Sequence, residues 1–188
     1  MSFYGSKELE SMGFQHVGEG AQVSSKASLY GVDRISLGAR CRIDDFCILS
    51  AGEGGIMIGR HVHIAAMCTL IGKGKIEVCD FAGISGRVSV YSSNDDYSGS
   101  CLTNPTVPEE FRRTDNRDVT IGRHAIVGAG SVVLPGVTIG EGAAVGALSL
   151  VNRSLEPFGV YAGRPAKHIK ERSRALLDAE QRFLGIAH

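Results

Sequence analysis

The stretch VTIGRHAIVGAGSVVLPGVTIGEGAAVGALSLV, from Val119 to Val151, places an aliphatic residue at every sixth position. The same spacing recurs through most of the chain in groups of three: Val17, Val23, Leu29; Leu37, Ile43, Leu49; Ile58, Ile64, Leu70; Val78, Ile84, Val90; Ile121, Val127, Val133; Ile139, Val145, Val151. A fixed short period is typical of a coiled array in which each turn stacks on the previous one. The sequence therefore predicts three short parallel strands per coil, with the aliphatic residues pointing into the axis.

A second row, four positions after the aliphatic row, holds small residues. It includes Cys41, Cys47 and Cys68, and elsewhere mostly alanine, serine or valine. We interpret these three thiols as small core residues, and Cys101, which lies outside the row, as an exposed one. The chain has no CxxC motif, and its one close pair of histidines lacks a third partner, so no metal site is expected.

Glycine marks the corners of the expected coil. Seven glycines directly follow residues of the aliphatic row, and we expect them in turns with positive φ, which glycine adopts without steric cost. They are Gly18, Gly38, Gly59, Gly122, Gly128, Gly140 and Gly146.

Composition excludes several classes of partner. The 188 residues are enough for one domain, and 20 basic residues balance 20 acidic ones, so no net field favours nucleic acid or an anionic membrane. No run approaches the roughly 20 apolar residues of a spanning helix, and no secretory signal opens the chain. We expect a cytoplasmic protein that does not insert into membranes.

The chain divides into three expected parts. Residues 1–16 form an N-terminal cap with a short helix opened by Ser6, residues 17–158 form the solenoid, and residues 159–188 form a C-terminal segment. The pattern after Pro165 predicts a helix with one apolar face, made of Ile169, Leu176, Leu177, Phe183 and Leu184.

The six-residue period stops between Val90 and Ile121. The intervening segment, about 91–118, is polar and too long for a simple corner, so we expect a functional loop. Its aromatic residues Tyr97 and Phe111 are expected to anchor it in an ordered conformation.

The stretch from Val119 to Val151, together with YAGRPAKHIK (Tyr161 to Lys170), resembles the hexapeptide-repeat acyltransferases. The resemblance covers roughly residues 17–170. It implies an all-β fold, a left-handed parallel β-helix with a protruding loop and a C-terminal α-helix. It also implies acetyl-CoA or another short acyl-CoA as donor, and a homotrimer with its sites between subunits.

The segment YSSNDDYSG, from Tyr91 to Gly99, separates two classes of acceptor. Related sugar O-acetyltransferases carry a histidine base near this loop, but here no histidine lies between His63 and His124. A hydroxyl needs a positioned base, whereas a neutral amine needs less help. The segment instead resembles nucleotide-sugar N-acyltransferases, including those acting on dTDP-4-amino-4,6-dideoxyhexoses.

The preferred hypothesis is therefore acyl transfer to the amine of a nucleotide-linked deoxyaminosugar, for surface polysaccharide synthesis. The alternative is O-acetylation of a galactoside- or maltose-type sugar, with His63 or His124 as base. A third possibility, less favoured, is a non-catalytic β-helix scaffold whose loop binds a partner.

The resemblance also implies site residues. Asp95 would hold the amine, and Ser85, ten residues earlier, would orient the acceptor or contact the thioester carbonyl; His124 is the alternative base. The remaining candidates for contact with the sugar are Asn94, Asp96, Glu110 and His63. A track of small residues, Gly128, Ala129, Gly146, Ala147 and Leu148, suits a narrow pantetheine arm, and the cations that follow it, Arg164, Lys167 and Lys170, suit the phosphates.

Overall fold

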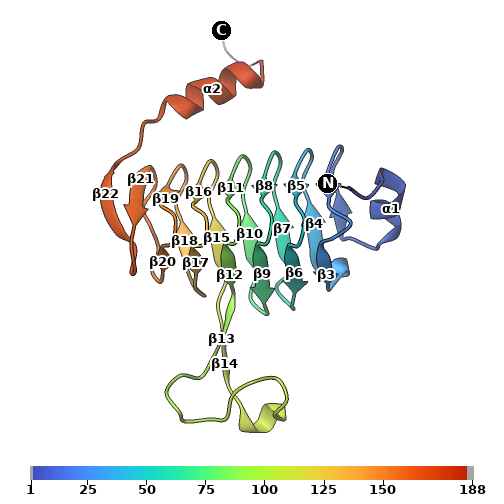
Figure 1. Cartoon of the computed structure of the whole chain (residues 1–188), viewed down its shortest axis with the longest axis vertical. Coiled ribbons are helices and arrows are strands. Elements are labelled where there is room, and N and C mark those ends of the chain that lie inside the picture. The colour runs from blue at the N-terminus through green and yellow to red at the C-terminus, as the bar shows by residue number, and fades with distance from the viewer. Residues whose placement is uncertain (1, 186–188) are drawn as a thin grey trace.

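The computed structural model describes residues 2–185 and shows a prism of three parallel sheets whose coils stack along one axis (Figure 1). Sheets 1 and 3 each contain six strands, and sheet 2 contains eight. Every neighbouring pair of strands along the solenoid is parallel except the last pair of sheet 2. The predicted β-helix is confirmed.

The strands of the three sheets alternate along the chain. Sheet 1 consists of β1 (His16–Val17), β4 (Ile35–Leu37), β7 (Ile56–Ile58), β10 (Ile76–Val78), β15 (Val119–Ile121) and β18 (Thr138–Ile139). Sheet 2 consists of β2 (Gln22–Val23), β5 (Arg42–Ile43), β8 (His63–Ile64), β11 (Gly83–Ile84), β16 (Ile126–Val127), β19 (Ala144–Val145), β21 (Gly159–Ala162) and β22 (Lys167–Glu171). Sheet 3 consists of β3 (Ser28–Tyr30), β6 (Ile48–Ala51), β9 (Thr69–Gly72), β12 (Ser89–Tyr91), β17 (Val132–Val133) and β20 (Leu150–Val151). We call the turns from sheet 1 to sheet 2 the first corner, those from sheet 2 to sheet 3 the second, and those from sheet 3 to the next coil the third.

The aliphatic row forms the core. In sheet 3, for example, Leu70 lies in register with Leu49 on one side and Val90 on the other, and all three are fully buried. Val17 and Leu29, in the first coil, are only half-buried because no earlier coil covers them. Identical slots therefore stack into a continuous apolar column along the axis.

The three cysteines of the small row are buried, as expected. Each thiol of the stacked pair donates to a carbonyl at the second corner: Cys47 Sγ lies 3.1 Å from the Ala65 oxygen, and Cys68 Sγ lies 3.0 Å from the Ser85 oxygen. Burial raises the pKa of the Cys41 thiol to about 12. Cys101 is partly buried rather than fully exposed.

The glycines that follow the aliphatic row do not adopt positive φ, so that expectation is wrong. They are needed because successive coils touch there. A Cβ on Gly38 would lie 2.4 Å from the Gly59 carbonyl carbon, and one on Gly128 would lie 2.5 Å from the Ala147 nitrogen. Positive φ falls three residues after the aliphatic row instead, at glycines such as Gly130 and Gly142 and at non-glycine residues such as His61 and Met67.

Both ends of the solenoid are covered. At the N-terminus α1 (Ser6–Ser11) begins after Gly5, whose N–H donates to the Glu8 carboxylate at 2.6 Å, and Leu9 packs into the core. At the C-terminus β22 pairs antiparallel with β21. Strand pairing protects the last edge of sheet 2, which would otherwise present unpaired backbone groups.

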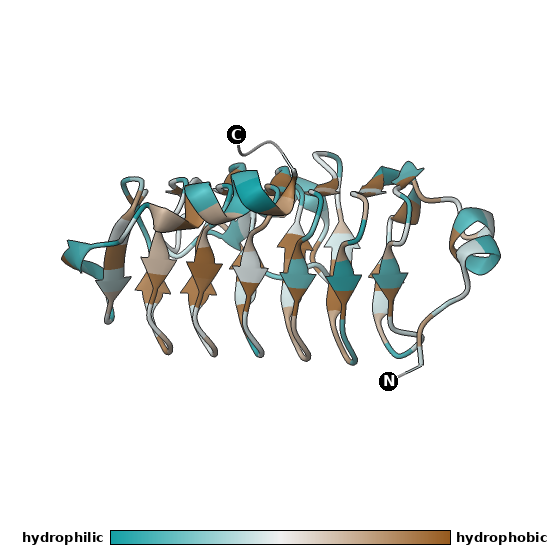
Figure 2. Ribbon diagram, turned by 90° about the horizontal axis from the view of Figure 1, so that it is seen from above, coloured by the Kyte–Doolittle hydropathy of each residue, from teal (hydrophilic) through white to brown (hydrophobic). Residues whose placement is uncertain are grey.

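The C-terminal helix therefore begins later than predicted. Residues 167–171 form β22, and Ile169 is an exposed strand residue rather than part of a helical face. Only α2 (Ala175–Phe183) is helical, and it lies across the corners of several coils (Figures 1 and 2). Within residues 2–185, no helix is long and apolar enough to cross a membrane.

The interruption of the period is a protruding hairpin (Figure 1). Its stalk is the antiparallel pair β13 (Ser93–Asp95) and β14 (Thr114–Asn116), and its tip includes the 3-10 turn η2 (Glu109–Phe111). A second 3-10 turn, η1 (Val32–Arg34), lies at the third corner of an early coil. Tyr97 and Phe111 are exposed by 87% and 57%, so they do not anchor the loop against this chain as predicted.

Replacing Leu70 by Ala should lower the free energy of unfolding by about 2–5 kcal/mol, because the methyl groups are lost from a slot closed on both sides by Leu49 and Val90. Ser89→Ala, on the outward side of the same sheet, is the matched control and should change stability by less than about 0.5 kcal/mol. Denaturant unfolding followed by circular dichroism measures both. Equal effects of the two substitutions would contradict the stacked core.

Candidate active site

A groove of about 750 Å³ lies where the hairpin leaves sheet 3. Asn94 and Asp95, on β13, line it together with residues from the strand ends of four coils and from the loop. The antiparallel register places Asp95 opposite Thr114, so the stalk holds it at the mouth of the groove. This volume is in the range of small-molecule sites.

The two neighbouring aspartates of this segment differ in environment. Asp96 accepts hydrogen bonds from the backbone N–H of Ser98, Ser100 and Cys101 and from two serine hydroxyls, which hold the pKa of its carboxyl well below the usual range. Its role is to close the loop. The Asp95 carboxylate, by contrast, has no hydrogen-bond or ion-pair partner among residues 2–185, so it is available to a ligand.

Sequence analysis missed several residues of the groove. Lys73, Tyr91 and Asn116 line it alongside Tyr97. Lys73 pairs with Glu109 of the loop at 3.3 Å, and Asn116 lies on the returning strand of the stalk. Only the hairpin brings these residues together, and no short-range pattern in the sequence indicates its register. Glu110, a predicted contact, lies exposed on η2 and does not line the groove.

Ser85 lies on a different corner from Asp95. It follows β11 at the second corner, where its N–H donates to the Val127 oxygen at 2.9 Å and its carbonyl accepts from Cys68. Its hydroxyl has no hydrogen-bond partner within residues 2–185. The three-residue strand β12 and its flanking turns separate Ser85 from β13, so the two candidates lie at opposite margins of sheet 3.

His63 lies on the outer face of sheet 2 and is held by a buried carboxylate. Its Nε2 is 2.9 Å from Asp44 Oδ2, while Arg42 Nε donates to Asp44 Oδ1 at 2.7 Å. The Asp44 side chain is only 7% exposed, against 51% for His63. Burial raises the pKa of Asp44, but the hydrogen bonds from His63 and Arg42 outweigh it and hold that pKa below the usual value.

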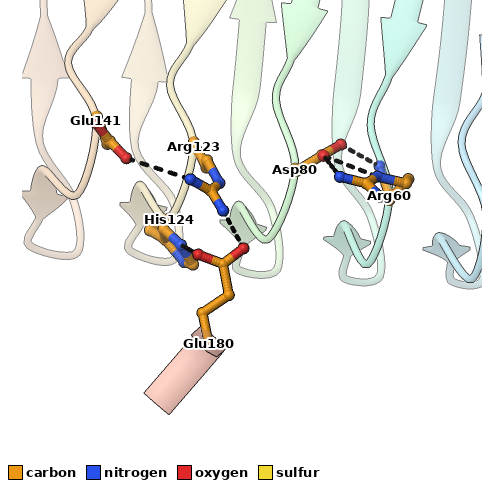
Figure 3. A network of polar contacts seen from close by, with 6 residues as sticks. All are labelled: Arg60, Asp80, Arg123, His124, Glu141 and Glu180. Atoms are coloured by element: carbon orange, nitrogen blue, oxygen red, sulfur yellow. Dashed lines mark hydrogen bonds and ion pairs between the residues drawn. The ribbon is translucent and has the colours of Figure 1, made fainter. Parts of the chain in front are cut away.

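His124, the alternative base, is engaged by the C-terminal helix (Figure 3). Its Nε2 lies 2.9 Å from Glu180 Oε2, and Arg123 donates to the other oxygen of the same carboxylate. The side chains of Glu180 and His124 are 6% and 10% exposed. His124 is thus at the first corner, while the hairpin leaves the opposite side of the prism (Figure 1).

A column of rings continues this contact. His61, Phe81 and His124 stack at successive first corners, with centroids 5.0 and 5.2 Å apart, and Phe183 of α2 meets His61 edge-on at 5.2 Å. Asp80, beside the column, is held separately by Arg60 at 2.7 Å (Figure 3). Ion pairs and aromatic contacts therefore hold α2 against the first corners of the solenoid. We interpret His124 as one of the residues that bind the helix there.

The predicted donor track follows the second corner of the later coils. Ala129, Ala147 and Leu148 are exposed there, and Arg164, Lys167 and Lys170 are exposed beyond the last coil. Gly128 and Gly146 are half-buried, and close approach of the next coil accounts for both: a Cβ on Gly146 would lie 2.9 Å from Ala162 Cβ. These glycines are therefore not in themselves evidence of a ligand.

Comparisons with known proteins agree with this architecture. The family described as bacterial transferase hexapeptide (six repeats) matches residues 118–153. Over 183 residues the chain is 52% identical to dTDP-4-amino-4,6-dideoxy-D-glucose acyltransferase of Escherichia coli, covering 97% of this chain and 95% of that protein. The chain belongs to the hexapeptide-repeat acyltransferases. The predicted family and class of enzyme are confirmed.

Solved structures extend the comparison. The chain matches AntD, an N-acyltransferase from Bacillus cereus in complex with dTDP and 3-hydroxybutyryl-CoA, with a TM-score of 0.93 and 45% identity over 98% of this chain and 97% of that chain. Variants of AntD altered at one serine, and at one aspartate ten positions later, have also been crystallised with coenzyme A. A maltose O-acetyltransferase from Clostridium difficile 630, at 20% identity and a TM-score of 0.61 over 89% of this chain and 75% of that chain, shares the fold.

Replacing Glu180 by Gln should destabilise the protein by about 1–3 kcal/mol at pH 7, because Arg123 and His124 lose a buried charged partner. The hydrogen bonds from these residues hold the pKa of Glu180 below its ordinary value of 4.5 against the opposing effect of burial. A lowered carboxyl pKa stabilises the fold above the ordinary value, and this stability is lost as the pH falls through the lowered value.

Thermal unfolding of the wild type and of Glu180→Gln across pH 3–8 therefore tests the contact. The difference in melting temperature should be present at pH 7 and should shrink below about pH 4.5, toward zero at the acid end. Asp178→Asn, an exposed change on the same helix, is the control. A difference that grows toward acid pH would contradict the assigned pair.

Proposed function

We propose that this protein transfers a short acyl group from coenzyme A to the amine of a nucleotide-linked deoxyaminosugar, of the dTDP-4-amino-4,6-dideoxyhexose class. The observation that carries this proposal is the unpartnered Asp95 carboxylate at the mouth of the groove, in a chain 52% identical to an acyltransferase named for such a substrate. A carboxylate favours the charged or hydrogen-bonding form of an amine beside it. In this scheme Asp95 holds the sugar amine, and Asn94 binds the sugar beside it.

Ser85 takes the role of orienting the reactants at the thioester. Ser85 and Asp95 are ten positions apart, the same spacing as the serine and aspartate altered in AntD. The amine attacks the thioester carbonyl carbon, the C–S bond breaks, and coenzyme A leaves as the thiol while the amine loses one proton. Donors directed at the carbonyl oxygen would stabilise the negative charge that develops there. Asp95 accepts or relays the proton.

The donor is an acyl-CoA, laid along the second corner of the later coils. Exposed Ala129, Ala147 and Leu148 would leave room for the pantetheine arm. Arg164, Lys167 and Lys170, beyond the last coil, would bind its phosphates. Both substrates are cytoplasmic metabolites, so we place the reaction in the cytoplasm.

The complete site requires two copies of the chain. Ser85 and Asp95 lie at opposite margins of sheet 3 in one chain, and Ser85 does not line the groove that Asp95 lines. The second corner also carries exposed apolar side chains, Phe46, Met67 and Leu148, that no segment of residues 2–185 covers. A homotrimer, in which the second corner of one copy faces the hairpin groove of the next, would satisfy both observations.

The activity is tested by thiol release from acyl-CoA in the presence of dTDP-4-amino-4,6-dideoxyglucose. We expect release with this acceptor and not with the corresponding 4-hydroxy sugar. Asp95→Asn should lower kcat/KM by at least about 100-fold, because the amine loses its charged partner. Asp96→Asn is unsuitable as a control because that residue closes the loop, so Asp115→Asn on the stalk serves instead.

Release with the hydroxyl sugar, retained by Asp95→Asn, would support O-acetylation with His63 as base and would overturn the amine assignment. No release with either acceptor, together with no calorimetric binding of coenzyme A, would favour a scaffold.

The assembly is tested by Met67→Asp. Aspartate tolerates the positive φ of 64° at this position, so the fold should be retained. The buried charge should dissociate the trimer and reduce activity, as light scattering and the thiol assay would report. Met57→Asp, equally exposed but on sheet 1, should leave the trimer intact. A trimer that survives Met67→Asp would contradict the proposed interface.

A further inference from the structure

The second corners of the solenoid are closed in two different ways. In the first coil the backbone closes the turn, because the Ala27 N–H donates to the Ser24 oxygen at 3.0 Å, as in an ordinary β-turn. At the corner that begins with Ser85, no backbone N–H of residues 2–185 donates to the Ser85 oxygen. The Cys68 thiol takes that place, with its Sγ 3.0 Å from the oxygen. A side chain from inside the solenoid therefore holds this turn.

Inner side chains also bind the carbonyls of other second corners. The Cys47 Sγ lies 3.1 Å from the Ala65 oxygen, one coil before the Ser85 contact. In the last coil the hydroxyls of Ser131 and Ser149 both donate to the Gly146 oxygen, at 3.1 and 2.7 Å. The small row thus supplies hydrogen-bond donors beneath the corners along which the proposed donor track runs, and cysteine and serine serve equally in it.

The contact from Cys68 fixes what the Ser85 corner presents on its outer side. The Ser85 carbonyl is directed inward at the thiol, and a trans peptide places the following N–H on the opposite side. The Gly86 N–H therefore points outward, and it has no hydrogen-bond partner within residues 2–185. The Ser85 hydroxyl is likewise unpaired there. One buried hydrogen bond thus orients two free donors that are adjacent in the chain.

The Cys68 thiol is a lasting donor in a dry environment. Its side chain is fully buried, so water does not compete for the Ser85 carbonyl. The neighbouring Cys47 thiol and burial raise the pKa of Cys68, which keeps the thiol protonated at neutral pH. Hydrogen bonds in such an interior are stronger than in water, and a carbonyl that loses its partner there is strongly penalised. Removal of the thiol should therefore shift the peptide that it holds.

We propose that Cys68 is a positioning residue for acyl transfer, whose thiol sets from inside the solenoid how Ser85 and the Gly86 N–H face the thioester. It acts through the peptide that it holds and touches neither substrate. The inference rests on the proposed function, which places the thioester at Ser85, and deepens it by assigning the group that orients Ser85.

Kinetics of two Cys68 variants test the role of the thiol. Cys68→Ala removes the donor but fits the position, which Ala27 occupies in the first coil. It should lower kcat about tenfold, roughly the effect of one hydrogen bond, and leave both KM values within about twofold. Cys68→Ser, whose hydroxyl can donate as those of Ser131 and Ser149 do, should keep kcat within about threefold of wild type.

Cys47→Ala is the matched control. Cys47 occupies the equivalent position one coil earlier, is equally buried, and donates to a carbonyl whose residue, Ala65, has no polar side chain. Its replacement should lower the melting temperature as much as Cys68→Ala does, but should leave kcat within about twofold when assayed well below that temperature. This comparison separates positioning of Ser85 from a general loss of stability.

Three kinetic results would overturn the assignment. The first is an unchanged kcat in Cys68→Ala, or a loss that Cys47→Ala reproduces. The second is an equal loss in Cys68→Ser, because the hydrogen bond would then not be what matters. The third is a raised KM for acyl-CoA with kcat unchanged, which would make the contact a matter of donor binding.

If wild type releases no thiol with any acceptor, the proposed function fails, and amide hydrogen exchange then tests the contact separately. The amides of Ser85 and Arg87 are hydrogen-bonded in the structure and should exchange slowly. Faster exchange of these two amides in Cys68→Ala, but not in Cys47→Ala, would still support a positioning role for the thiol. Equal exchange in the two variants would overturn it.

Discussion

The structure depends on the close stacking of one coil on the next. Adjacent strands of a sheet are about 4.8 Å apart, so every residue at a corner faces the residue at the equivalent position one coil away. Glycine is required at these corners because a side chain would collide with the next coil. A Cβ on Gly18 would lie 2.3 Å from the Ala39 nitrogen, and one on Gly59 would lie 2.6 Å from the Asp80 nitrogen. The same stacking seals the aliphatic column and turns the outer faces into straight rows of side chains. Any functional site must be built from those rows or from an insertion between coils.

The candidate site uses both routes. The hairpin is an insertion, and it carries Asp95 away from the regular surface, where no row supplies a partner for its carboxylate. Ser85, His63 and Gly83 belong to the rows and are positioned by strand register rather than by loop conformation. In the proposed function the inserted hairpin would therefore hold the acceptor, and the stacked coils would hold the donor. A trimer would bring the two together at each interface.

The sequence predicted most of the fold because the six-residue period reports the stacking directly. It placed Leu70, Cys47 and Cys68 in the core, and the break after Val90 located the hairpin. The period could not supply the hand of the coil, which came from the family resemblance alone. The pattern also led to a wrong prediction of positive φ at the corner glycines. Glycine is selected both where coils touch and where a turn needs positive φ, and the sequence alone does not distinguish these two causes.

The sequence did not predict side-chain contacts between segments that lie far apart in the chain. Glu180 follows no periodic rule that marks it as buried, yet it is the most buried residue of α2, ahead of Leu176 and Leu177. It is buried because the side chains of Arg123 and His124, at adjoining corner positions, converge on it. Asp44 is a similar case, since its partner His63 lies one coil away and 19 residues along the chain.

These two buried carboxylates hold histidines for different ends. Glu180 contacts His124 and leaves only 10% of the His124 side chain exposed, as expected of a residue that holds α2 in place. Asp44 orients His63 while leaving 51% of that side chain exposed, beside a strand that lacks a Cβ. A histidine held by a carboxylate on one nitrogen and free on the other is prepared to meet a ligand. The difference between the two sites lies in what covers the ring: α2 covers His124, and within residues 2–185 no segment covers His63 to the same extent.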